Sequence, residues 1–233
     1  MSNKTRNFLV VLAALAVMFE GAWVVTPSGN LLGPVSAQAR VNHAVLMQPG
    51  EVPAQLEQAV IAVEDERFLQ HHGIDVIGLG RSIAYDTTHL CGCEGGSTIT
   101  EQLVKDVYLN GTDTVFNKPV DMFVALKVEA VSTKREILAY YLSDLPTGPR
   151  MYGVINAACT YYHRPLAQLD LAQNAMLAGV AQAPSRYNPA DHPQAAAGRR
   201  HQVLEAMVAE QFITRAAADA ADAEPVTAPG PGC

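Results

Sequence analysis

Three short polar segments between residues 64 and 121 hold the side chains best suited to chemistry. The first segment, residues 64–73, reads Glu-Asp-Glu-Arg-Phe-Leu-Gln-His-His-Gly. A carboxylate such as Glu64, at the end of an apolar-faced helix and followed by an aromatic residue, a histidine and a glycine, can act as a general base at the edge of a cleft. An acidic helix end is more often a solvated surface, so this segment alone leaves both interpretations open.

The second segment, residues 95–105, combines a glycine-flanked helix start with hydroxyl groups and a lysine. On a helical wheel, Thr98, Gln102 and Lys105 share one face, and the apolar residues occupy the opposite face. Hydroxyls at a helix start with an aligned lysine suit a phosphate or a pyrophosphate. The alternative is a capped amphipathic helix in which Lys105 pairs with Glu101.

The third segment is Asn-Lys-Pro-Val-Asp at residues 117–121. Pro119 suits the first position of a helix, which places Asp121 in the first turn. An acid there meets the helix dipole favourably, so Asp121 has a purely structural explanation. Lys118, beside the helix start, is the more suggestive residue for binding an anion.

The surrounding chain, residues 53–211, reads as helices joined by loops. Leu56, Val60 and Val63 recur at helical spacing and form an apolar stripe. Further helices are expected to begin near five positions: Ser97 or Thr98, Pro119, Thr133, Asp170 and Gln194. No segment alternates with period two, so the sequence predicts an all-α domain. Residues 73–96 are expected to form a long functional loop.

The N-terminus predicts a membrane anchor. Lys4 and Arg6 precede an apolar stretch, Phe8–Val25, whose 18 residues would span about 27 Å as a helix. Basic residues before the stretch place the N-terminus in the cytoplasm and the rest of the chain outside. The alternative is a cleaved signal peptide, with Ala-Gln-Ala at residues 37–39 as its cleavage site. That site lies well beyond the apolar stretch, which favours the anchor.

Composition narrows the remaining choices. The net charge is −7 and no basic stripe is present, which argues against a nucleic-acid partner. An exported chain permits disulfides among its four cysteines, Cys91, Cys93, Cys159 and Cys233. Cys91 and Cys93 lack a second pair of ligands at zinc spacing. We expect either one disulfide from Cys91 or Cys93 to Cys159, or none.

Five motifs in order, over about residues 55–214, resemble those of the family 51 glycosyltransferases, the peptidoglycan glycosyltransferases. The first segment is similar to E-D-x-x-F-x-x-H-x-G, the second to G-G-S-T-I-T-Q-Q-L-x-K-N and the third to R-K-x-x-E. Residues 134–142 resemble K-x-x-I-L-E-x-Y-L-N, and residues 152–189 complete the family order. The resemblance implies a lysozyme-like helical fold with a small jaw over a cleft that faces the membrane.

The resemblance also implies roles for single residues. Glu64 would be the general base that takes the proton from the acceptor sugar, and Asp121 the second carboxylate, which orients the reactants or a pyrophosphate-bound divalent ion. The residues implied to bind the pyrophosphate are Ser97, Thr98, Gln102, Lys105 and Lys118. The resemblance implies no obligatory cofactor. The divalent ion bound to the pyrophosphate would be Mg or Mn. No protein metal site is expected.

Several residues depart from the family pattern around this site. Glu101 replaces a Gln, Asp106 an Asn, Asn117 an Arg and Asp121 a Glu. The first two add negative charge beside a site for pyrophosphate, and Asn117 removes a positive charge. The shorter Asp121 withdraws its carboxylate by about 1.5 Å, and a misplacement near 1 Å can lower a rate about 100-fold. We therefore expect an active but slow enzyme.

The main hypothesis is a monofunctional peptidoglycan glycosyltransferase that acts on lipid II and the growing glycan strand at the membrane, with other cell-wall proteins as candidate partners. The alternatives are a non-catalytic lipid II-binding scaffold and a lysozyme-like hydrolase, which the two lysines oppose. No transpeptidase domain is expected, because too little chain follows Gln211. The expected organisation is an anchor at 1–26, a linker at 27–52, the catalytic domain at 53–215 and a disordered tail at 216–233.

Overall fold

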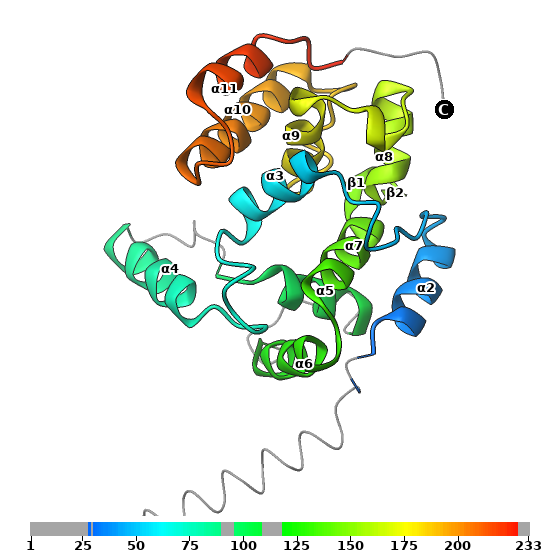
Figure 1. Cartoon of the computed structure of the whole chain (residues 1–233), viewed down its shortest axis with the longest axis vertical. Helices are drawn as coiled ribbons and strands as arrows, with labels where there is room; N and C mark the ends of the chain where they lie inside the picture. Colours follow the sequence, from blue (N-terminus) through cyan, green and yellow to red (C-terminus); the bar gives the residue numbers. More distant parts are fainter. Residues whose placement is uncertain (1–27, 29, 90–95, 109–117, 228–233) are drawn as a thin grey trace, which may run out of the picture.

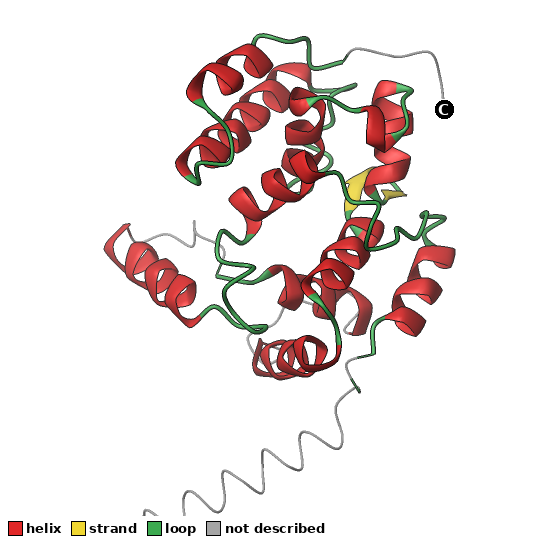
Figure 2. Cartoon of the chain, in the orientation of Figure 1, coloured by secondary structure: helices red, strands yellow, loops and turns green. Residues whose placement is uncertain are grey.

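The computed structural model describes residue 28 and residues 30–89, 96–108 and 118–227. This part of the chain contains ten α-helices, one short 3-10 turn and one two-stranded hairpin (Figure 2). The α-helices are α2 (Leu32–Val41), α3 (Ala54–Glu64), α4 (Val76–His89), α5 (Ile99–Tyr108), α6 (Lys118–Val131), α7 (Lys134–Asp144), α8 (Val154–Tyr162), α9 (Leu171–Val180), α10 (Pro193–Ala209) and α11 (Arg215–Asp222). The hairpin pairs β1 (Pro146–Gly148) with β2 (Met151–Tyr152), and the 3-10 turn is Leu166–Gln168. The prediction of a helical domain is confirmed.

The helices form two groups that meet near the centre of the molecule (Figure 1). α3 packs against α9 and α10, and α11 lies on α10. α5 packs against α6 and α7, and α2 packs against α7. Helix α4 stands out at the side of the molecule, with only slight contacts to the other elements described (Figure 1). The end of α3 and the start of α5 therefore meet at the junction of the two groups.

Six of these helices lie where the sequence predicts them: α3, α5, α6, α7, α9 and α10. The start of α5 is a reciprocal cap, in which Glu101 N–H donates to Thr98 Oγ1 (3.1 Å) and Thr98 N–H donates to Glu101 Oε2 (2.9 Å). Thr133 and Glu136 form the same arrangement at the start of α7. Local capping chemistry thus fixes the beginnings of two helices that build the site.

The expected long loop at 73–96 is wrong over most of its length, because residues 76–89 form α4. Two glycines, Gly78 and Gly80, fall within one turn and weaken its helical pattern. The hairpin was also not foreseen, since strands of three and two residues are too short to show alternation. Helix α8, which begins after Gly153 at a φ of +82°, lacks a side-chain cap that could have announced it.

Two segments expected to lack a fold contain helices that join the core. In the expected linker, α2 buries Val35 and Ala39, which lie four residues apart on one face. In the expected disordered tail, α11 buries Ala218 and Ala221, and Thr214 caps its start. The prediction of disorder is therefore wrong up to Asp222, because small alanine side chains have weak hydropathy and yet pack closely. The expected anchor, residues 1–26, lies outside the described residues.

Candidate active site

Glu64 stands between two adjoining cavities. One, of about 280 Å³, is lined by four carboxylates, Glu64, Asp65, Glu66 and Asp75, together with Arg81 of α4; we call it the acidic cavity. The other, of about 410 Å³, is lined by Lys105, Asp106 and Arg199, with Gln102 and Tyr141; we call it the lysine cavity. Val63, Glu64, Ser97 and Gln182 line both cavities. The Glu64 carboxylate can therefore contact groups bound in either cavity.

Glu64 is the last residue of α3 and is half-buried. Its Oε2 accepts a hydrogen bond from Gln102 Nε2 at 3.1 Å. Burial raises the pKa of the Glu64 carboxyl above its usual value, whereas the Gln102 bond and the charge of Arg199 act in the opposite direction. A carboxylate with a raised pKa is a stronger base once it is ionised, as a general base requires.

The residues next to Glu64 hold the end of α3 against the start of α5. Asp65 is buried and accepts from His71 Nε2 at 2.9 Å and from the Ile99 N–H at 3.0 Å. Phe68 is fully buried in the core, and Gly73 has a φ of +92°. A side chain on Gly73 would start 2.8 Å from the backbone of Ala125. These contacts of the first motif hold the end of α3, and with it Glu64, in a fixed place beside α5.

Lys118 and Ser97 are brought together, as the prediction of a shared anion site requires. Lys118 Nζ lies 2.7 Å from Ser97 Oγ and 3.2 Å from Glu101 Oε2. Glu101 thus pairs with Lys118 on α6, and not with Lys105 one turn further along α5. The Glu101 side chain is almost fully buried, while that of Lys118 is about one-third exposed. The Glu101 carboxylate is therefore a counter-charge to Lys118, and any anion that binds Lys118 must compete with it.

The other predicted residues divide between the cavity walls and the interior. Gln102 and Lys105 line the lysine cavity beside Asp106. Burial raises the pKa of Asp106 above its usual value, and the charge of Lys105 offsets part of this rise. Thr98 borders the acidic cavity, but its hydroxyl donates to the Gly73 carbonyl at 2.7 Å. Asp121 is buried in the first turn of α6 and lines neither of these two cavities. Asn117 lies outside the described residues.

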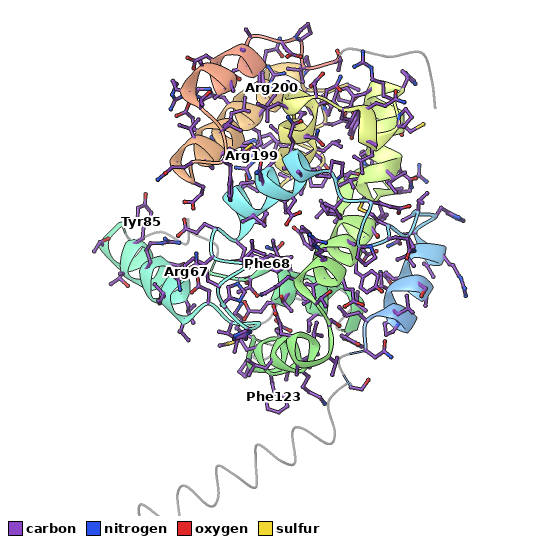
Figure 3. The ribbon with its side chains drawn as sticks, viewed as in Figure 1. Arg67, Phe68, Tyr85, Phe123, Arg199 and Arg200 are labelled. Atoms are coloured by element: carbon purple, nitrogen blue, oxygen red, sulfur yellow. The ribbon has the colours of Figure 1, made fainter. Side chains whose placement is uncertain are left out.

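Arg199, Gln182 and Tyr141 line the lysine cavity without having been predicted as site residues. Arg199 belongs to α10, lies on the side of that helix towards α3 (Figure 3), and donates to the Gly179 carbonyl at 3.3 Å. Burial lowers the pKa of its guanidinium, and the charge of Glu64 opposes this. An arginine on the buried stripe of α10, with Ala196 and Val203, was a detectable signal. Gln182, in a connecting turn, carried none.

The sequence also led to expectations about disulfides, metal binding and a membrane span. Cys159 takes part in a disulfide, while Cys91, Cys93 and Cys233 lie outside the described residues. Within the described ranges, no cluster of three or more His, Cys, Asp or Glu side chains is placed to hold a metal ion. In the same part of the chain, no helix has both the length and the apolar character needed to cross a membrane.

The sequence is similar to that of a known protein family and of its members. The transglycosylase family model matches residues 29–208. A protein of Cupriavidus necator named as a transglycosylase is 36% identical over 94% of each chain. Penicillin-binding protein 1A of Haemophilus influenzae is 36% identical over 88% of this chain and 24% of its own. A crystal structure of that protein aligns with 79% of this chain at 25% identity and a TM-score of 0.49. The chain spans about a quarter of the length of penicillin-binding protein 1A.

Proposed function

The chain belongs to the transglycosylase family, and on this premise we propose that it polymerises lipid II into glycan strands and releases undecaprenyl pyrophosphate. One observation carries the proposal: Glu64 lies between two cavities, and cations line the second of them. Glycosyl transfer to a sugar hydroxyl needs a base beside the acceptor and positive charge beside a pyrophosphate leaving group. The two cavities offer these functions on either side of Glu64.

In the proposed reaction, the 4-hydroxyl oxygen of the acceptor sugar bonds to the anomeric carbon of the donor strand. The bond from that carbon to the pyrophosphate breaks at the same centre, with inversion. Glu64 takes the hydroxyl proton, and the departing pyrophosphate keeps the electron pair. Because the carboxylate must be ionised to accept the proton, the rate should rise with pH until Glu64 is fully ionised. The raised pKa of Glu64 shifts this rise in rate to higher pH.

We place the pyrophosphate at Ser97, which borders both cavities. Lys118 already contacts the Ser97 hydroxyl, and Lys105 and Arg199 line the lysine cavity beside it. These cations can stabilise charge that develops on the leaving group, which is the main electrostatic need of the reaction. A divalent cation, Mg or Mn, would enter bound to the phosphate oxygens, and no cofactor is proposed to be obligatory.

Asp121 has a less direct role in this proposal than the family resemblance implies. It lies one turn after Lys118 in α6 and is buried. Residues three apart on a helix share a face, so the carboxylate can orient Lys118 from behind. We therefore propose that Asp121 acts through the position of Lys118 and any pyrophosphate-bound cation.

We propose that the N-terminal stretch anchors the domain on the outer face of the cytoplasmic membrane and that α4 belongs to the jaw. α6 and the start of α2 lie at one end of the molecule (Figure 1). Leu32, Val120 and Val131 are exposed on these helices, and Phe123 points outward at the same end (Figure 3). Exposed apolar side chains gathered at one end suit contact with a membrane surface.

The test is polymerisation by the full chain in detergent with labelled lipid II, with products separated by size. Glu64→Gln should abolish polymerisation, since the amide cannot accept the proton. Binding of lipid II or moenomycin should stay within about threefold, because Gln is nearly isosteric with Glu. Full activity in this variant would refute the mechanism.

A second candidate function, a non-catalytic protein that binds lipid II, is favoured by the Glu101–Lys118 ion pair. A buried carboxylate 3.2 Å from Lys118 Nζ reduces the positive charge available to a leaving group. In that case wild type binds lipid II but gives no polymer. The same assay separates the two functions.

A further inference from the structure

A chain of two hydrogen bonds reaches Glu64 from α7. The Tyr141 hydroxyl donates to Gln102 Oε1 at 3.2 Å, and Gln102 Nε2 donates to Glu64 Oε2 at 3.1 Å. Tyr141 is buried, with 3% of its surface exposed. The three residues come from three helices, α7, α5 and α3, which converge on the wall of the lysine cavity.

The chain of bonds has one direction when Glu64 is ionised. A carboxylate only accepts hydrogen bonds, so the amino end of the Gln102 amide must face Glu64. The carbonyl end then faces Tyr141, and the phenol hydroxyl must donate to it. Without the hydroxyl, the amide loses the partner that holds its carbonyl end, and rotation of the amide would present that end to the carboxylate.

We propose that Tyr141 is a positioning residue for Glu64, acting through the orientation of the Gln102 amide. This inference rests on the proposed function, in which Glu64 is the general base. A hydrogen bond to Oε2 fixes the plane of the carboxylate and leaves Oε1 to accept the proton from the acceptor hydroxyl. The proposal gives Gln102 a task different from lining the pyrophosphate site. It also gives a task to Tyr141, which belongs to the fourth motif but was assigned no role from the sequence.

Electrostatic observations agree with this geometry. The Gln102 bond is the largest influence that lowers the pKa of Glu64 against the effect of burial. The pKa of Tyr141 itself is raised well above its usual value, first by burial and then by Glu64, so the hydroxyl keeps its proton and remains a donor. The other charged groups around Glu64 are Asp65, Glu66, Asp75, Arg81, Lys105, Asp106 and Arg199. None of these is changed by removing the hydroxyl.

The test is Tyr141→Phe in the full chain in detergent, with Tyr140→Phe as the matched control. Tyr140 precedes Tyr141 in α7, is similarly buried, and borders a groove beside α2 instead of the active site. We expect Tyr141→Phe to lower kcat about 10- to 100-fold, with KM for lipid II within about twofold. The acid limb of its pH profile should move to higher pH, because Glu64 loses an oriented donor. Tyr140→Phe should change neither quantity.

A double-mutant cycle tests whether Tyr141 acts through Gln102. In a Gln102→Met background, Tyr141→Phe should reduce kcat by less than about twofold further. Independent losses that multiply would overturn the proposal, as would a loss of kcat in Tyr141→Phe with an unmoved acid limb. An equal loss in Tyr140→Phe would also overturn it, since that result would indicate general damage to α7.

A measurement without turnover separates this inference from the proposed function. Carbon-13 NMR of the glutamate carboxyl groups, with Glu64 assigned by Glu64→Gln, gives its titration in wild type and in Tyr141→Phe. We expect the Glu64 titration to move to higher pH in the variant. If wild type makes no polymer and the titration still moves, the proposed function fails and the positioning role stands. Normal polymerisation with an unmoved titration overturns the positioning role alone.

Discussion

At the scale of single residues, the site depends on charges held by short polar contacts, and Glu101 is the clearest example. Its carboxylate serves two purposes: it caps the start of α5 through the Thr98 N–H, and it pairs with Lys118. Glutamine can perform the first task, because its carbonyl oxygen also accepts from the Thr98 N–H. It cannot neutralise Lys118. The position therefore offers a change in charge with little change in fold.

We predict that Glu101→Gln raises polymerisation about tenfold, which corresponds to roughly 1.4 kcal/mol of transition-state stabilisation. The reason is that no carboxylate then offsets the positive charge of Lys118 beside the leaving pyrophosphate. Initial rates with labelled lipid II measure the effect. Glu136→Gln is the matched control, because Glu136 completes the equivalent capping box at the start of α7. An unchanged rate in Glu101→Gln, or an equal gain in Glu136→Gln, would show that the Glu101–Lys118 pair does not limit turnover.

The motifs indicated which residues would lie near one another, but not which contacts they would make. Glu64 and Ser97 line one cavity, and Lys118 contacts Ser97. Which partner each charge chooses depends on how α5 lies against α6, and spacing within one helix contains no such information. Helical spacing offered Lys105 as an alternative partner for Glu101, whereas the structure pairs Glu101 with Lys118. Arg199 is more than 100 residues from Glu64 in the sequence, and the two become neighbours only through the packing of α10 on α3.

At the scale of elements, the helices with strong local signals were the ones predicted. α5 and α7 begin at capping boxes, and α10 begins with proline. α4 was missed because Gly78 and Gly80 lower its helix propensity. α11 was missed because its alanine-rich, weakly hydrophobic composition resembles that of a disordered tail. α11 packs on α10, and such tertiary contact does more than helix propensity to stabilise a helix of eight residues.

The junction of α7 with α2 contains a buried acid that should make stability depend on pH. Asp144 is the last residue of α7, and burial raises its pKa to about 6, against a hydrogen bond from Asn42 Nδ2. Because the folded state holds the proton more tightly than the unfolded state, this group lowers the free energy of unfolding as pH rises from about 4 to 6. The full effect is on the order of 2–3 kcal/mol.

Asp144→Asn should therefore be more stable than wild type at pH 7.5 and close to it at pH 4. We expect the difference in Tm to grow by roughly 4–10 °C between these two values of pH. Thermal unfolding of both proteins in the same detergent measures it. Asp219→Asn, a matched change on the exposed face of α11, should show no such growth. A difference that is the same at both values of pH would contradict a buried, protonated Asp144.

At the scale of the whole molecule, the described domain bears on the choice between a membrane anchor and a cleaved signal. The Ala-Gln-Ala sequence at residues 37–39 lies inside α2, and Ala39 is 3% exposed. Cleavage after Ala39 would remove Leu31 and Val35 from the core as well, both almost fully buried. Each buried aliphatic side chain of this size contributes about 1.5–3 kcal/mol. A mature chain without these residues would lose part of the packing between α2 and α7.

We therefore predict that the intact chain stays in the membrane fraction after an alkaline carbonate wash. Lys4, Arg6 and the apolar stretch Phe8–Val25 should hold it there, with the domain on the outer face, because the basic residues favour the cytoplasm. Mass spectrometry of the retained protein should find peptides from before Arg40. A matched chain in which Leu12 and Leu15 are both changed to Arg should leave the membrane fraction, since charge near the centre of the bilayer opposes insertion by about 3 kcal/mol per residue. A soluble wild-type form that starts at Arg40 would instead show that the segment is a signal peptide, and that α3 to α11 fold without α2.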